Sequence, residues 1–301
     1  MKILLLGKNG QVGWELQRSL APLGNVIALD RQGCLDLSGN LGDLDAIAAT
    51  VRALKPDIIV NAAAYTAVDK AESEAALAGR INADAPGVLA RQAAAIGAWL
   101  IHYSTDYVFD GSGSSPWPEE ASTNPLSVYG RTKRDGEVAI EASGARAVVL
   151  RTSWVYAARG QNFAKTVLRL ARERDVLNVV ADQHGAPTGA ELIADVTAHI
   201  IRQIFGASNP SELAGIYHLA AAGETTWHGY AQFVLQHASR QGYALKVSPE
   251  QIGAIATEDY PVPAARPRNS RLNLAKLEKA FNLKMPPWQQ GVQRMLDEIQ
   301  L

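Results

Sequence analysis

The residues best suited to chemistry in this sequence are a tyrosine and a lysine four positions apart, Tyr129 and Lys133. Residues four apart on a helix share one face, so this spacing places a phenol beside an ammonium group. Thr105 stands earlier in the chain, just after an apolar run, and offers a hydroxyl group. Such a set could donate a proton without a metal ion or a histidine. We therefore predict that Thr105, Tyr129 and Lys133 are catalytic.

An isolated tyrosine is a poor proton donor at neutral pH, because its ordinary pKa is about 10. A neighbouring positive charge stabilises the phenolate. We therefore expect Lys133 to lower the pKa of Tyr129 towards the working pH, as in a tuned acid catalyst.

The elements that must position these residues alternate between strands and helices, which predicts an α/β fold with a doubly wound parallel sheet. Strands are expected where short apolar runs occur, and helices where Ala-rich periodic segments lie between them. The expected strands are residues 3–6, 26–29, 58–60, 99–101 and 147–150, and the expected helices are 12–20, 44–54, 71–82 and 87–96.

A glycine-rich turn follows the first expected strand and opens the first helix, with Gly7, Gly10 and Gly13 in a GxxGxxG spacing. In this context the turn predicts a dinucleotide site, with the pyrophosphate at the helix N-terminus. Asp30 ends the second strand and favours NADH, because a carboxylate repels a 2′-phosphate. Arg31 could pair with that phosphate instead. We therefore expect either NADH or NADPH to bind.

The chain resembles the extended short-chain dehydrogenase/reductase family over most of its length. The resemblance rests on residues 7–13, 61–64, 104–111, 129–133 and 151–156. It implies a Rossmann-type NAD(P)-binding domain over residues 1–160, with a strand and helix near 190–222 returning to it. A smaller mixed α/β domain, mainly for substrate binding, is expected over residues 161–301.

Within that family, residues 67–72, 102–109, 162–165, 182–188 and 266–271 resemble enzymes of dTDP-rhamnose and O-antigen biosynthesis. These enzymes reduce the 4-keto group of dTDP-4-dehydro-L-rhamnose to give dTDP-L-rhamnose. The resemblance implies further roles for residues at matching positions. Cofactor contacts are implied for Gln11, Val12, Asp36, Leu37, Ala63, Ala64, Thr66, Tyr103, Tyr129 and Lys133, and substrate contacts for Val68, Ser104, Thr105, Asp106, Tyr107, Tyr129, Trp154, Asn162 and Arg266.

Three readings of the site stay open. Related 4,6-dehydratases carry an Asp-Glu pair after this threonine, whereas this chain has Asp106 and Tyr107, which favours simple reduction. A nucleotide-sugar epimerase with tightly bound NAD would use the same tyrosine and lysine. A regulatory subunit of the same fold would need no intact catalytic set.

Some of the implied substrate contacts also have simpler explanations. The arginines at 266, 268 and 271 suit a diphosphate, but solvated loop charges would look the same. Trp154 could pack against a sugar face or be part of a core.

Composition limits the remaining possibilities. A net charge of −1 over 301 residues argues against a nucleic-acid partner. No apolar stretch is long enough for a membrane span, and the single Cys34 fits a reducing compartment, so we expect a cytoplasmic protein. The resemblance implies a homodimer bridged by structural Mg²⁺, with Glu15, Glu191 and Glu298 as ligands, although each could be a solvated helix-face charge.

Overall fold

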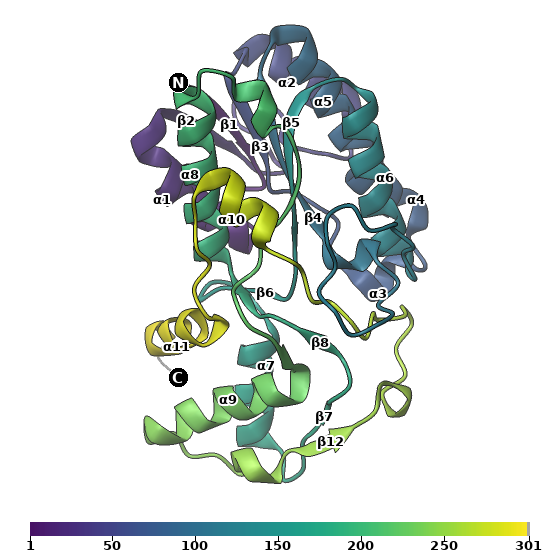
Figure 1. The fold of residues 1–301 in the computed structure, drawn as a ribbon, viewed down its shortest axis with the longest axis vertical. Coiled ribbons are helices and arrows are strands. Elements are labelled where there is room, and N and C mark those ends of the chain that lie inside the picture. The colour runs from purple at the N-terminus through teal and green to yellow at the C-terminus, as the bar shows by residue number, and fades with distance from the viewer. Residues whose placement is uncertain (300–301) are drawn as a thin grey trace.

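The computed structural model describes residues 1–299 and has two parts (Figure 1). The upper part of Figure 1 is built on a six-stranded sheet, and the lower part consists of helices around short strand pairs. The strands of the main sheet are β1 (Lys2–Leu6), β2 (Asn25–Leu29), β3 (Ile58–Asn61), β4 (Trp99–Thr105), β5 (Arg146–Thr152) and β10 (Gly215–His218).

The main sheet has the order β10-β5-β4-β3-β1-β2, and every neighbouring pair is parallel. This confirms the predicted doubly wound sheet. The order reverses between β1 and β3, which is where such sheets bind ligands beyond the carboxyl ends of their strands.

Both faces of the sheet are buried, and β1 shows how. Ile3 and Leu5 belong to one hydrophobic core, and Leu4 and Leu6 to another on the opposite face. Side chains alternate along a strand, so an unbroken apolar run serves both cores.

Helices cover each face. The first core contains residues of α1 (Gln11–Leu20), α8 (Ala190–Gly206) and α10 (Ala275–Phe281). The second contains residues of α2 (Leu44–Leu54), α5 (Ala85–Ile96) and α6 (Val128–Ala142). The helix that carries Tyr129 and Lys133 is therefore packed against the sheet beside α5.

Residues 71–82 are mostly helical, as predicted, but the helix is not continuous. The chain instead forms α3 (Val68–Ala71), α4 (Ala75–Gly79) and a π-helical turn over Arg80–Asp84 that runs into α5. The hydroxyl of Ser73 donates to the carbonyl of Lys70, and such a local bond competes with helix continuation.

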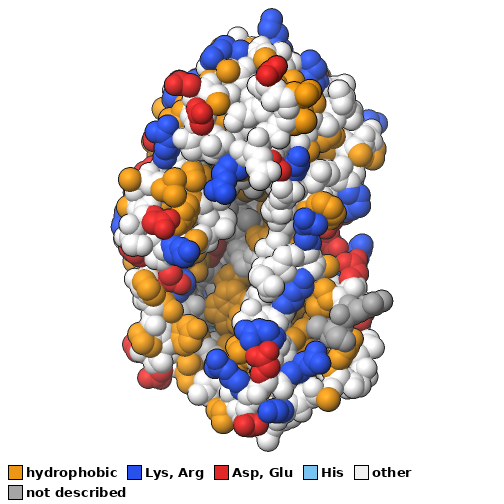
Figure 2. All heavy atoms as spheres, turned by 180° about the vertical axis from the view of Figure 1, so that it is seen from behind, with side chains coloured by type: hydrophobic (Ala, Val, Ile, Leu, Met, Phe, Trp, Pro, Cys, Tyr) orange, Lys and Arg blue, Asp and Glu red, His pale blue; other side chains and the backbone are white. Residues whose placement is uncertain are grey.

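The lower part has its own core, made by α7 (Phe163–Glu173), α9 (Trp227–Arg240) and α11 (Trp288–Glu298). Three short pairs accompany it: β6 (Val155–Tyr156) with β9 (Thr188–Gly189), β7 (Asn178–Val180) with β12 (Gly253–Ile255), and β8 (His184–Gly185) with β11 (Thr225–Thr226). The chain crosses between the two parts repeatedly, because α8, β10 and α10 all return to the main sheet. Seen from behind, the surface is hollowed at mid-height, and Lys and Arg side chains surround the hollow (Figure 2).

Candidate active site

The glycine turn is tightly packed, as a phosphate-binding turn requires. Gly7 has φ +87°, and a Cβ added to it would lie 2.7 Å from the backbone nitrogen of Ala63. A Cβ on Gly13 would lie 2.0 Å from the carbonyl oxygen of Gly7. The N-cap of α1 is Gly10, which supplies no side-chain cap. The first amides of α1 are thus left for an anion, and the turn fits a dinucleotide pyrophosphate.

The two residues expected to select the cofactor differ in their surroundings. Asp30 accepts a hydrogen bond from Asn9 at 2.8 Å and lies 3.5 Å from the ammonium of Lys8. Arg31 is exposed. Desolvation would raise the pKa of Asp30. The backbone N–H of Gln32, the charge of Lys8 and the side chain of Asn9 together outweigh it, so the pKa is lowered. Asp30 is therefore a carboxylate beside the glycine turn, and the exposed Arg31 follows it in the chain.

Thr105, Tyr129 and their neighbours meet at the carboxyl end of β4. Ser127 caps α6 by accepting from Gly130 N at 3.2 Å, which starts the helix just before Tyr129. Thr105 lies beside the Tyr129 phenol, where its side chain lowers the pKa of Tyr129 against the effect of burial. Thr105 also donates to Asp106 at 3.0 Å. The structure thus brings the predicted hydroxyl and phenol together.

Lys133 does not act on Tyr129 as expected. Burial, reinforced by Asp106, raises the pKa of Tyr129 to about 12. The ammonium of Lys133 instead donates to the carbonyl of Tyr103 at 2.6 Å and lies 3.1 Å from Nε2 of His102. The prediction of a lowered tyrosine pKa was wrong for this structure, because Lys133 is bound to β4 and burial dominates.

Lys133 is itself strongly perturbed. It is only 2% exposed, and burial lowers its pKa to about 8, although the Glu137 carboxylate opposes this. An ammonium that titrates near neutral pH is typical of a functional site.

Asp106 and Tyr107 complete the wall around Tyr129. The Tyr107 and Tyr129 rings meet edge to face, with centroids 5.7 Å apart. Burial raises the pKa of Asp106 to about 6, against hydrogen bonds from Ser270 and Thr105 that lower it. The site therefore has one buried carboxyl group and an aromatic ring where a dehydratase would have two acids.

Arg266 reaches this wall from the C-terminal half. It donates to Asp69 at 2.8 Å, and its guanidinium lies 6.0 Å from the centre of the Tyr107 ring. Asp69 also accepts from the backbone N–H of Ala264 at 3.2 Å. The Asp69 carboxylate thus ties the proline-rich loop to α3. In contrast, Arg268 and Arg271 pair with Glu258 and Glu224.

The other predicted substrate residues have structural partners. The hydroxyl of Ser104 donates to Glu137, and Asn162 caps α7 by accepting from Lys165 N at 3.1 Å. Trp154 is half-buried, has φ +48° and stacks on Trp227 with centroids 3.7 Å apart. Val68 is half-buried at the start of α3.

The remaining cofactor candidates follow the edge of the glycine turn or lie beside it. Ala63, Ala64 and Thr66 lie in the segment after β3, and Gly7 packs on its first residues. Asp36 and Leu37 lie in a small turn that the bridge between Cys34 and Leu37 closes. The side-chain amide oxygen of Gln11 is buried, and Val12 packs against the first core. The Tyr103 hydroxyl points towards α8 and bonds Thr197 at 2.8 Å, so only its backbone reaches Lys133.

A buried ion pair below the site was missed. Arg151 donates to Glu137 at 2.9 and 2.6 Å, and the side chains are 3% and 4% exposed. Glu137 lies four residues after Lys133 on the same helix face, and this spacing was the available signal. The pair joins α6 to β5.

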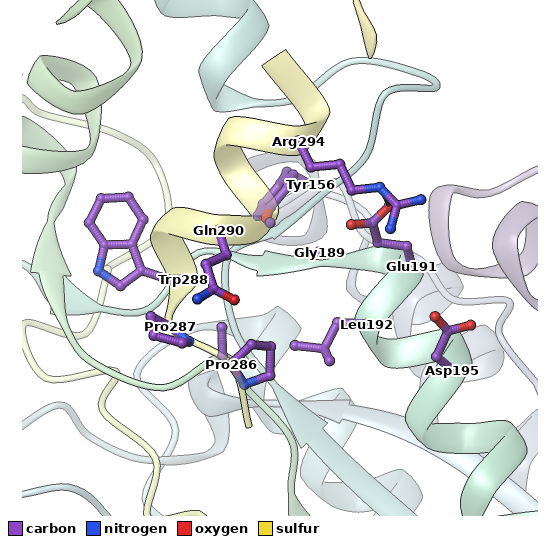
Figure 3. Close-up of a pocket in the computed structure, with 12 residues that line it drawn as sticks. Tyr156, Gly189, Glu191, Leu192, Asp195, Pro286, Pro287, Trp288, Gln290 and Arg294 are labelled. Atoms are coloured by element: carbon purple, nitrogen blue, oxygen red, sulfur yellow. Dashed lines mark ion pairs between the residues drawn. The ribbon is translucent and has the colours of Figure 1, made fainter. Parts of the chain in front are cut away.

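Of the three glutamates predicted as metal ligands, Glu191 lines the pocket drawn in Figure 3. Burial raises the pKa of Glu191, and the charges of Glu298 and Glu15 raise it further. However, the guanidinium of Arg294 lies 3.6 Å from both Glu191 and Glu298, and Glu15 pairs with Arg18. Within residues 1–299 no three possible ligands are grouped so that they could hold a metal ion. The arrangement neutralises the carboxylates with arginine and does not fit the predicted magnesium site.

None of the helices within residues 1–299 is long and apolar enough to cross a membrane.

Known proteins match the chain over its whole length. The family model described as the RmlD substrate binding domain matches residues 1–301. A dTDP-4-dehydrorhamnose reductase of Shigella flexneri is 55% identical over 99% of this chain and 98% of its own. The solved dTDP-4-dehydrorhamnose reductase of Clostridium acetobutylicum is 34% identical, with a TM-score of 0.89 and full coverage of both chains. The Bacillus anthracis structure, in complex with NADP, is 32% identical, with a TM-score of 0.86 and 99% coverage of both chains.

Together with the fold and the site, these matches place the chain among the extended short-chain dehydrogenases/reductases, which are nicotinamide-dependent oxidoreductases. Within that class the chain belongs to the dTDP-4-dehydrorhamnose reductase family.

Proposed function

We propose that this protein reduces the 4-keto group of dTDP-4-dehydro-L-rhamnose to give dTDP-L-rhamnose. The bound nicotinamide cofactor, NADPH or NADH, supplies the hydride. The protein has to hold the ketone beside the cofactor and deliver one proton to the oxygen that becomes a hydroxyl group.

The observation that carries this proposal is the placement of Thr105 beside the phenol of Tyr129 at the end of β4, where it lowers the pKa of Tyr129 against the effect of burial. A raised pKa keeps the Tyr129 proton in place until negative charge develops on the substrate oxygen. Thr105 orients the phenol and the substrate oxygen. We assign the Lys133 ammonium to the nicotinamide ribose of the bound cofactor.

The arginine on the facing loop fits the diphosphate of the substrate. Arg266 has one nitrogen committed to Asp69, and its Nη1 is buried without a partner within the described residues. A buried guanidinium nitrogen needs an acceptor, and a diphosphate oxygen can supply one.

Substitution of Tyr129 by phenylalanine tests the proton donor. The Tyr129→Phe variant should lose at least about 100-fold in kcat, because general acid catalysis contributes that much or more. Its affinity for NADPH, measured by fluorescence quenching, should change less than about threefold, because the glycine turn is untouched.

Steady-state NADPH oxidation with dTDP-4-dehydro-L-rhamnose measures the rate. If the variant keeps a tenth of the wild-type kcat, Tyr129 is not the donor. If the wild type converts this substrate without added reductant and oxidises no NADPH, the protein is an epimerase.

The resemblance also implies a homodimer in the cytoplasm, and both stay predictions. Light scattering during gel filtration, compared with the 32.3 kDa of one chain, measures the assembly.

A further inference from the structure

A buried histidine lies directly behind Lys133. His102 is on β4 and is 1% exposed. Its Nε2 lies 3.1 Å from the ammonium nitrogen of Lys133, and its Nδ1 lies 3.1 Å from the side-chain amide nitrogen of Asn61. Asn61 ends β3 and is the register partner of His102 across the parallel pair. The sheet therefore places Asn61 beside His102, and α6 adds Lys133 to the same row.

The protons in this row are determined by Lys133. An ammonium group can only donate, so Nε2 must carry a lone pair and the ring proton must be on Nδ1. Nδ1–H then has to donate to Asn61. In the structure the Asn61 amide nitrogen faces Nδ1, and the amide oxygen accepts a 3.3 Å bond from Ala63 N. A half-turn of the amide exchanges these two atoms, so that its oxygen can accept from Nδ1–H. With its oxygen turned towards Nδ1, Asn61 selects the tautomer that can accept from Lys133.

His102 stays neutral beside this charge. Burial and the Lys133 ammonium hold the pKa of His102 well below its ordinary value. The other charged group that faces Lys133 is Glu137, on the same helix. A neutral acceptor is the group that can hold an ammonium in a buried site without cancelling its charge.

We propose that His102, with its tautomer set by Asn61, is a positioning residue that holds the Lys133 ammonium for the reaction. This proposal rests on the proposed function, in which Lys133 takes part in the reaction. Two protons of Lys133 are committed, one to the Tyr103 carbonyl and one to His102, so the third has a fixed direction. His102 touches neither substrate nor cofactor in this proposal and acts only through Lys133.

The tautomer can be measured without turnover. Nitrogen-15 NMR of histidine-labelled protein at pH 7, with the His102 signal assigned through the His102→Gln variant, should show a neutral ring protonated at Nδ1. An imidazolium, or a ring protonated at Nε2, overturns the proposal. This result does not depend on whether the protein reduces the proposed substrate.

The second readout is the alkaline limb of kcat/KM against pH. The His102→Phe variant loses the acceptor of the Lys133 ammonium, which disfavours the charged form of Lys133. The alkaline limb should therefore move to lower pH by about one unit. His102→Gln offers an amide oxygen and should restore most of the shift. Asn61→Leu, which no longer selects the tautomer, should move the limb in the same direction and serves as the test if the phenylalanine variant does not fold.

His218→Phe is the matched control, because His218 is equally buried at the end of β10 but packs on Phe109. It should leave the limb in place. A limb that stays at the wild-type pH in both the His102→Phe and Asn61→Leu variants would show a merely structural role, even if kcat falls. Failure of the proposed function is seen separately, as an active Tyr129→Phe variant.

Discussion

At the scale of single residues, the site rests on a charged pair that water does not reach. Glu137 receives Arg151 through two hydrogen bonds and also the hydroxyl of Ser104. Ser104 is next to Thr105, and Glu137 is one turn beyond Lys133. The Glu137 carboxylate therefore holds β4, β5 and α6 together at the candidate site. Breaking such a pair is costly, since the remaining charge is buried alone.

Glu137→Gln should therefore lower the free energy of unfolding by about 3–5 kcal/mol, measured by urea denaturation. The double variant Glu137→Gln with Arg151→Met removes the unpaired charge and should recover much of the loss. A loss below 1 kcal/mol in the single variant would show that the pair does not stabilise the fold.

Sequence patterns indicated the candidate catalytic residues but not the groups behind them. Tyr129 and Lys133 were visible because helical spacing puts them on one face. The partners of Lys133 lie on β4, and the pairing of Asn61 on β3 with His102 exists only once the sheet has its register. The raised pKa of Tyr129 was missed for the same reason, since burial is a property of the folded chain.

At the scale of elements, the glycine turn depends on how closely α1 approaches β1. Gly13→Ala should push α1 away, because the new Cβ would lie 2.0 Å from the Gly7 carbonyl oxygen. We expect NADPH affinity to fall by at least about tenfold, with a lower Tm. Gly206→Ala is the control, since a Cβ there meets nothing within 4 Å. Unchanged NADPH binding in Gly13→Ala would mean that the turn does not hold the pyrophosphate.

The strands and longer helices could be predicted because apolar runs and Ala-rich periodic segments determine them directly. Residues 71–82 misled the prediction because their composition suits a helix, while one serine hydroxyl interrupts it. The magnesium prediction depended on likeness alone, and the position of Arg294 between two glutamates is a matter of packing between α8 and α11.

At the scale of the whole molecule, Arg294 links the lower part to the sheet through Glu191. Burial raises the pKa of Glu191, Arg294 opposes this, and Glu298, Glu15 and Asp195 add to it. When the pKa of a carboxyl group is higher in the folded than in the unfolded protein, its ionisation lowers the free energy of unfolding as the pH rises. At low pH the group is protonated in both the folded and the unfolded protein, and it costs no stability.

Arg294→Ala should therefore destabilise the protein more at pH 7 than at pH 4. The effect at pH 7 should be at most about 1 kcal/mol, or about 2 °C in Tm, because the arginine is largely exposed. Thermal unfolding at the two pH values measures it, with Arg240→Ala on α9 as a surface control. An equal loss at both pH values would contradict the electrostatic explanation.

The return of β10 to the sheet has a consequence for how the protein is made. Strand β5 is complete at residue 152, but its outer neighbour β10 begins only at residue 215. At about 5–20 residues per second, the ribosome takes roughly three to twelve seconds to synthesise the intervening segment. During that interval the nascent chain carries an open sheet edge, which is a template for pairing with other chains. A ribosome that stalls between these two strands therefore leaves a product prone to aggregate, whereas synthesis past residue 218 lets the chain close its own edge.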